Sequence, residues 1–317
     1  MGKKILILFL LALAFILPLI IGTHMIHIFT TILLYMSLSL SWDMMLRTGQ
    51  LSFSTAAFFG VGAYVSVITV ADMGISPVLS IILGGVFAAL VAYLIGFAVL
   101  KLRLIYFAIV TLALTFVFSV IIRNIPDITG GPSGKILTSS IFNGNSQKIY
   151  WLILIITVGV IAISELIRNS KIHFAINSIR NDELTARSTG INVFKYLLLI
   201  FVISSAIQGM VGSLYAQQYA FVVPESIFSL DFLLLPIAMA LVGGIYSTMG
   251  PVVGAVILGL ISEYLKLIMP YGHLMVYGII IVLIILFLPQ GIFKPLNSKF
   301  KQIMHSNRGE EHANTTG

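Results

Sequence analysis

The chain has 317 residues, of which 59% are hydrophobic and only 9% are charged, and its mean hydropathy is +1.08. Soluble domains carry about 25% charged residues, so this composition excludes a water-soluble surface and predicts apolar residues that face lipid or one another. The absence of cysteine excludes disulfides, thiolate zinc sites and a cysteine nucleophile, and the net charge of +7 fits basic loops beside a membrane better than a nucleic-acid partner.

The N-terminal segment joins Lys3 and Lys4 to an apolar run over residues 5–21. The run resembles a signal peptide, but it is longer than the usual hydrophobic region and no A-x-A-like cleavage site follows, so we expect an uncleaved first span. At about 20 residues per helix, the chain divides into about ten candidate spans. They are residues 5–21, 25–45, 51–71, 77–100, 104–122, 150–167, 196–216, 232–245, 251–268 and 273–289.

The eighth candidate, 232–245, is short, and we expect it to be tilted, re-entrant or buried by its neighbours. The overall expectation is therefore an all-α polytopic membrane protein with roughly eight to ten transmembrane helices. We expect both termini to be cytoplasmic, because only four of the 18 Lys and Arg residues then lie outside, and basic residues stay preferentially in the cytoplasm. These four are Arg123, Lys135, Lys148 and Lys266.

This topology predicts a transmembrane domain over residues 1–295 and a polar cytoplasmic tail over 296–317. The external loop, about 123–149, carries a glycine-rich turn. The cytoplasmic loop, about 168–195, reads as one amphipathic helix in which apolar and charged side chains alternate. The apolar set is Phe174, Ile176, Ile179 and Leu184, and the charged set is Arg180, Asp182, Glu183 and Arg187.

Residues 131–135 (GPSGK) suggest a phosphate-binding loop, but Thr129 stands where that motif needs glycine and Ile136 replaces its Ser or Thr. An external turn that gates or docks a partner, or a plain loop, explains the segment better. Among ionisable residues, Asp43, Asp72, Glu165 and Asp231 fall at span ends, and Glu263 in the ninth span, one turn before Lys266, is the exception. This is either a neutralised pair or part of a solute pathway.

No catalytic constellation can be assembled inside the bilayer, so we expect no enzyme activity, metal or cofactor in this chain. Small residues lie on three helical faces, which pack against neighbouring helices or line a solute route. The first contains Ser52, Thr55, Gly62 and Ser66, the second Ser205, Gly209, Gly212, Ser213 and Ala216, and the third the GxxxG pair Gly250 and Gly254.

Five stretches in order resemble the M-type permeases of branched-chain amino acid ABC importers, a family that also includes permeases for urea and short amides. The first is 48–53 (TGQLSF) with 56–64 (AAFFGVGAY). The others are 106–112 (YFAIVTL), 129–131 (TGG), 179–192 (IRNDELTARSTGIN), and 243–255 (GGIYSTMGPVVGA) with 287–291 (FLPQG).

The resemblance implies partners: a second homologous permease, two cytoplasmic ATPases and an external substrate-binding protein, in a prokaryotic inner membrane. It implies ATPase coupling through Arg180, Glu183, Ala186, Arg187 and Gly190, although Glu183 stands one residue early for the general EAA-x-x-x-G pattern. The small-residue faces, independently of the resemblance, predict helix packing at Gly209, Gly212, Gly250 and Gly254. Expected pathway or gating residues are Gln50, Ser52, Ser54, Thr55, Thr129, Gly130 and Gly131. An ion-coupled secondary transporter is the competing hypothesis.

Overall fold

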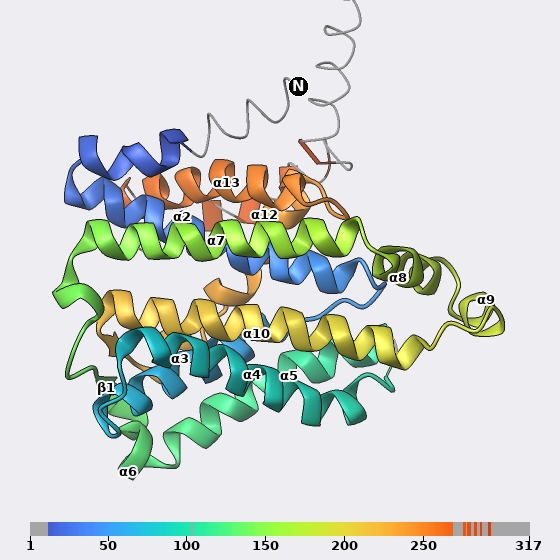
Figure 1. Cartoon of the computed structure of the whole chain (residues 1–317), viewed down its shortest axis with the longest axis horizontal. Coiled ribbons are helices and arrows are strands. Elements are labelled where there is room, and N and C mark those ends of the chain that lie inside the picture. Colours follow the sequence, from blue (N-terminus) through green and yellow to red (C-terminus); the bar gives the residue numbers. More distant parts are fainter. Residues whose placement is uncertain are drawn as a thin grey trace, which may run out of the picture.

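A computed structural model describes residues 12–102, 104–268, 275–276, 278–279, 282–283, 286 and 291–292. Residues 12–20 are helical, and long helices dominate the rest (Figure 1). The long helices are α2 (Thr23–Leu46), α3 (Thr55–Ala71), α4 (Pro77–Val99), α5 (Ile105–Arg123), α7 (Ser146–Arg168), α10 (Val193–Tyr219), α12 (Asp231–Gly243) and α13 (Met249–Ile268). The short elements are α6 (Pro126–Thr129), η1 (Gly131–Ser133), β1 (Lys135–Ile136), η2 (Ile141–Gly144), α8 (Lys171–Asn181), α9 (Glu183–Ser188), β2 (Phe221–Val222) and α11 (Pro224–Ile227).

Within the described residues, seven helical stretches are long and apolar enough to cross a bilayer. They are α2, α4, α5, α7, α10, α13 and the stretch Pro224–Gly243, which contains α11 and α12. The expectation of a polytopic all-α membrane protein is confirmed. Residues 5–11 of the first predicted span and most of the tenth, 273–289, lie outside the described residues.

The predicted span over 51–71 begins later than expected. Residues 50–54 are not helical, and α3 starts only at Thr55, so this apolar helix has 17 residues. The predicted short span 232–245 forms α12, which packs on α13 and α2 and is buried along most of its length. Burial by neighbours explains why so short a helix is stable in this position.

The helices form two groups, which are visible on opposite sides of Figure 1. In one group α2 packs on α7, α12 and α13, and in the other α10 packs on α3 and α4. Helix α10 approaches α3 so closely that a Cβ added at Gly62 would lie 2.0 Å from the Gly209 carbonyl oxygen. A Cβ added at Gly212 would likewise lie 1.9 Å from the Phe59 carbonyl oxygen. Close backbone approach through small residues is the usual packing of membrane helices.

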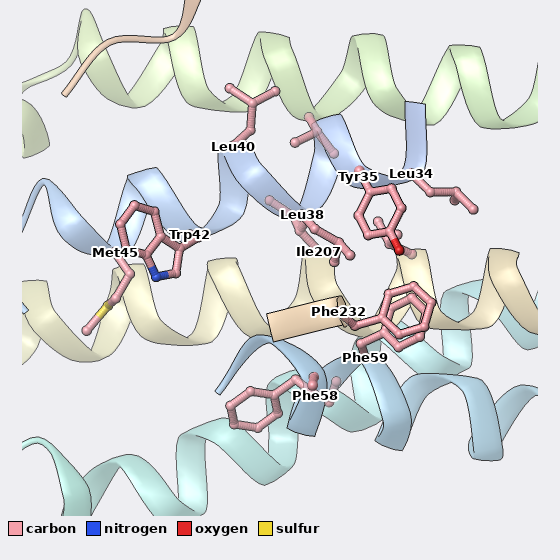
Figure 2. Close-up of a cluster of buried hydrophobic side chains, with 14 of the residues drawn as sticks. Leu34, Tyr35, Leu38, Leu40, Trp42, Met45, Phe58, Phe59, Ile207 and Phe232 are labelled. Atoms are coloured by element: carbon pink, nitrogen blue, oxygen red, sulfur yellow. The ribbon is translucent and has the colours of Figure 1, made fainter. Parts of the chain in front are cut away.

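Aromatic and aliphatic side chains from α2, α3, α10 and α12 join the two groups. The rings of Phe59 and Phe232 stack with centroids 4.2 Å apart. Figure 2 shows Tyr35 beside this stack at one end of the cluster, and Trp42 with Met45 at the other. Trp42 is 1% exposed, and its indole Nε1 donates to the Ser52 carbonyl oxygen at 2.8 Å. The core therefore runs along α2 and fixes the segment that precedes α3.

The two long loops lie at opposite ends of the bundle, with α8 and α9 at one end and β1 and α6 at the other (Figure 1). Strand β1 pairs antiparallel with β2, with Lys135 opposite Val222 and Ile136 opposite Phe221. The 168–195 loop forms two helices, which corrects the expectation of one. Asp182 is extended (φ −157°, ψ 108°), and its carboxylate accepts from the backbone N–H groups of Leu184 and Thr185, so it ends α8 and caps α9.

Candidate functional site

Three of the predicted coupling residues, Glu183, Ala186 and Arg187, belong to α9. Arg187 donates to Glu183 at 2.7 Å, an i,i+4 ion pair that is largely exposed on the arginine side. Ala186 is buried at 2% exposure. After α9, Gly190 adopts φ +83°, and its N–H donates to the Arg187 carbonyl. The N–H of Ile191 donates to the Ala186 carbonyl, and these two bonds form a Schellman motif.

Large apolar side chains on these helices are exposed. Phe174 of α8 is 73% exposed and Leu184 of α9 is 71% exposed. Beside Phe174, partial burial and the positive charges of Arg47 and Arg180 lower the pKa of His173, which favours a neutral imidazole at pH 7. This end of the bundle thus presents apolar side chains together with the Glu183–Arg187 pair.

The remaining coupling residue, Arg180, points to the loop between α12 and α13. Its guanidinium carbon lies 4.2 Å from the centroid of the Tyr246 ring, a cation–π contact. The Tyr246 N–H in turn donates to Asp43 Oδ1 at 2.7 Å. The predicted coupling loop is therefore joined to α2 through Tyr246.

Asp43 and Arg47 form a buried ion pair that the sequence analysis missed. Asp43 was expected at a span end and Arg47 in a cytoplasmic segment, but they are 0% and 2% exposed. Arg47 Nη2 lies 2.7 Å from Asp43 Oδ2 and 3.1 Å from Ser164 Oγ, which is 3.2 Å from Thr248 Oγ1. The four-residue spacing of Asp43 and Arg47 on an apolar helix was the available signal. The pair connects α2, α7 and the α12–α13 loop.

The predicted pathway residues before and at the start of α3 are all buried: Gln50, Ser52, Ser54 and Thr55. The hydroxyls of Ser52 and Ser54 are 2.8 Å apart, and the Phe53 N–H donates to Thr111 Oγ1 at 3.0 Å. These contacts, with the Trp42 indole, satisfy a non-helical backbone inside the protein. Within the described part of the chain, Gln50 Oε1 and Thr55 Oγ1 are buried without a hydrogen-bond partner, so polar atoms remain for a solute or water.

The residues Thr129, Gly130 and Gly131, predicted to lie outside, form a compact turn. Thr129 is buried, and its hydroxyl contacts the Ile122 and Ile125 carbonyls at 2.6 and 2.7 Å and accepts from the Gly131 N–H at 3.2 Å. Gly130 and Gly131 have positive φ angles of 77° and 57°. Lys135, also in this loop, bonds to Asp72 Oδ2 at 2.5 Å. The hydroxyl of Thr129 therefore forms its hydrogen bonds within the turn and stabilises the turn's conformation.

The four predicted packing glycines lie at close backbone approaches. A Cβ at Gly209 would lie 2.4 Å from Ala88 Cβ, and one at Gly254 would lie 1.8 Å from the Met239 carbonyl oxygen of α12. A Cβ at Gly250 would lie 1.7 Å from the Gly244 carbonyl oxygen, and Gly212 meets α3 as described above. All four sites leave no room for a side chain.

The fold and these sites define a multi-pass α-helical membrane protein with polar residues buried beside its hydrophobic core and two short helices at one end. A family model described as "Branched-chain amino acid transport system / permease component" matches residues 24–285. The chain belongs to this family, which confirms the resemblance drawn from its motifs.

Curated relatives agree with this assignment. The high-affinity branched-chain amino acid transport system permease protein LivM of Escherichia coli (strain K12) is 26% identical over 98% of this chain and 79% of its own length. The permease protein LivH of the high-affinity system of Salmonella typhimurium is 26% identical over 77% of this chain and 85% of its own length. A probable LivM of Methanocaldococcus jannaschii is 24% identical over 46% of this chain and 47% of its own length. No solved structure matches the chain.

Proposed function

We propose that this chain is the transmembrane permease subunit of an ATP-driven ABC importer in a prokaryotic inner membrane. It translocates branched-chain amino acids that an external binding protein delivers. Two separate cytoplasmic ATPase subunits hydrolyse ATP, and this chain binds no cofactor. Similarity to both LivM and LivH, two permease proteins with different names, supports a second homologous permease as the partner within the membrane.

The observation that carries this proposal is the exposed surface of α8 and α9. Phe174 and Leu184 are among the most exposed large apolar side chains described, and the helices that carry them, α8 and α9, lie at one end of the helix bundle (Figure 1). Apolar anchors on short helices with a charged pair beside them suit a groove on a soluble partner. A cytoplasmic ATPase is such a partner.

The contacts of these helices suggest how the partner's motion reaches the spans. Helix α8 packs on α7 and α10, and Arg180 contacts Tyr246, which binds Asp43 of α2. When ATP binding closes the ATPase dimer, a displacement of α8 acts on all these elements together. Rigid packed helices respond by switching between discrete arrangements, here outward-facing and inward-facing.

The test co-expresses this chain with the ATPase and permease genes that neighbour its own gene, and measures subunit association and leucine uptake in vesicles. We expect uptake that needs ATP and survives dissipation of ion gradients. The double substitution Phe174→Ser and Leu184→Ser should release the ATPases and abolish uptake. Ile136→Ser, which removes a side chain that is 67% exposed at the opposite end, should do neither.

Uptake by this chain without ATPases and driven by an ion gradient would overturn the proposal in favour of a secondary transporter. ATP-dependent uptake of urea or a short amide, with no uptake of leucine, would keep the importer and overturn the substrate.

A further inference from the structure

A cleft of about 420 Å³ opens at the end of the bundle opposite α8 and α9. It lies between the N-terminal half of α2, the C-terminal end of α10, the first turn of α12 and the last turns of α13. The chain continues from α10 into β2, which pairs with β1 of the external loop, and this places the cleft at the β1 end. Its volume is within the range of small-molecule sites, about 300–1,000 Å³.

The inner wall of the cleft is aromatic. The Phe232 ring lies 5.1 Å from the Tyr215 ring and 5.7 Å from the Tyr35 ring, measured between centroids. Tyr219 stands 4.4 Å from Tyr215 and is half-exposed. Tyr35 and Phe232 also belong to the core around α2, so their positions are set by packing (Figure 2). A rigid aromatic wall offers both apolar surface and negatively polarised ring faces.

Three charged groups complete the cleft, and they come from two helices. On α13, Lys266 Nζ bonds to Glu263 Oε1 at 2.7 Å, and both side chains are partly exposed. On α12, Asp231 lines the same cleft and makes no ion pair within the described part of the chain. Ionisable groups near a membrane-embedded pathway are costly unless they pair or bind a solute. The cleft therefore holds one ammonium group and two carboxylates. The Glu263 carboxylate is paired with Lys266, and the Asp231 carboxylate is available to a ligand.

This combination complements an α-amino acid. The ligand's carboxylate suits the Lys266 ammonium, and its ammonium suits the Asp231 carboxylate and the tyrosine faces, because charge-assisted hydrogen bonds are the strongest polar contacts. A branched aliphatic side chain would pack on the Phe232 and Tyr215 rings. An uncharged solute such as urea can form hydrogen bonds with these groups but no ion pair with either of them.

We infer that this cleft is a binding site on the permease itself for a zwitterionic α-amino acid with an apolar side chain. The inference rests on the proposed function for the direction in which the solute travels. Before moving inward, a solute released at the outer face occupies the cleft, with its charges held by Asp231 and Lys266.

The absence of cysteine from the chain allows a direct test of occupancy. Ser229 lines the cleft, so Ser229→Cys in the purified full chain in nanodiscs should react with a maleimide, and millimolar L-leucine should slow that reaction. Ser133→Cys on the external loop, where the residue is exposed, serves as the control and should react at a rate that leucine does not change. No ATP, ATPase or binding protein is needed.

Ligand analogues separate the two charge contacts. We expect no protection by 4-methylpentanoate, which lacks the ammonium, or by 3-methylbutylamine, which lacks the carboxylate. Lys266→Met and Asp231→Asn should each raise the leucine concentration for half-protection by about tenfold, the effect of removing one charged hydrogen-bond partner. Lys266→Arg should retain protection.

Equal protection by leucine and 4-methylpentanoate would show that the ammonium is not recognised and would overturn the site. So would unchanged labelling in leucine by a chain that supports ATP-dependent leucine uptake, an outcome that leaves the proposed function standing. Protection by leucine in a chain that associates with no ATPase would instead support the site and contradict the proposed function.

Discussion

The guanidinium of Arg180 lies over the ring of Tyr246, 4.2 Å from its centroid, and so joins α8 to the loop between α12 and α13. Gly49, shortly after the end of α2, lies close to the backbone of Arg180, because a Cβ added at Gly49 would lie 3.2 Å from the Arg180 Cα. Tyr246 holds a positive φ of 62°, which is rare for a residue with a side chain. The α12–α13 loop is thus held in one shape at the point where it meets α8.

Removing either partner of this contact should weaken coupling while leaving membrane insertion intact. A cation–π contact at a partly exposed site contributes about 0.5–1 kcal/mol. We expect Arg180→Ala and Tyr246→Leu each to lower ATP-dependent uptake, and the double variant to lose little more than either single one. The measurement is uptake per inserted protein across the four members of the cycle. Independent, multiplicative losses would show that the two residues do not act together.

The buried pair of Asp43 and Arg47 predicts an unusual order of stabilities. Asp43→Asn leaves the Arg47 charge uncompensated and should cost about 3–5 kcal/mol in the free energy of unfolding. Arg47→Met added to Asp43→Asn removes that charge, so the double variant should be more stable than the single one. Thermal unfolding in detergent, followed by tryptophan fluorescence, measures both. A double variant less stable than Asp43→Asn would mean that Arg47 is stabilised mainly by Ser164.

Hydropathy predicted most of the helices well because lipid-facing helices must be apolar over about 20 residues. The predicted span 77–100 is α4, Pro77–Val99, whose start is marked by proline in its first turn. Composition could not reveal the non-helical segment 50–54, because its backbone is held by Trp42 and Thr111, which lie elsewhere in the chain. Local propensity carries no information about such partners.

The candidate sites also combine features that the local sequence predicted with features that depend on residues elsewhere in the chain. The i,i+3 spacing of Glu263 and Lys266 predicted their ion pair, but Asp231 and Tyr35 join them only through the packing of α12 and α2 on α13. Likewise, the sequence of the 168–195 loop showed apolar and charged residues in alternation but not the break at Asp182. That break depends on one side chain accepting two backbone N–H groups, a local cap in an otherwise helical pattern.

Because α13 approaches α12 closely, we expect a larger side chain to destabilise the protein at the α12–α13 contact and to be tolerated at an open helix surface. Gly254→Leu forces a side chain where a Cβ would already lie 1.8 Å from the Met239 carbonyl oxygen, and overpacking of this kind costs about 1–3 kcal/mol or more. Gly159→Leu on α7 meets no atom within 4 Å and should be tolerated. Yield of monodisperse protein and its unfolding temperature report the difference. Equal behaviour of the two variants would contradict the packing of α12 on α13.

The opposite placement of the two long loops predicts opposite labelling from outside the cell. Both Asn181 and Ser133 are exposed, at the α8 end and the β1 end of the bundle respectively. In intact cells an impermeant thiol reagent should modify Ser133→Cys and spare Asn181→Cys, because positive-inside sorting puts the basic 168–195 loop in the cytoplasm. Opened membranes should label both variants. Strong labelling of Asn181→Cys in intact cells would reverse the orientation.

The end of α9 gives the sharpest test of coupling. Gly190 occupies the left-handed position of the Schellman motif, and a Cβ there would meet no atom within 4 Å, so any effect of substitution comes from backbone conformation alone. For a residue with a Cβ, the left-handed conformation raises the free energy by about 1–2 kcal/mol, and β-branched residues adopt it least readily. Gly190→Val should therefore redirect the chain between α9 and α10 without disturbing the spans.

We expect Gly190→Val to insert and fold normally but to lower both binding-protein-stimulated ATP hydrolysis and leucine uptake, or to lose the ATPases on purification. Gly190→Asn is the matched control, because asparagine tolerates the left-handed region and should retain most activity. Thr189→Val places the same side chain one residue earlier, where φ is −85°, and should also be active. If Gly190→Val assembles and transports like the parent, α9 does not carry the coupling. The ATPase would then engage another cytoplasmic segment, and the segment from Lys101 to Arg103, which follows α4 in the sequence, is the next one to substitute.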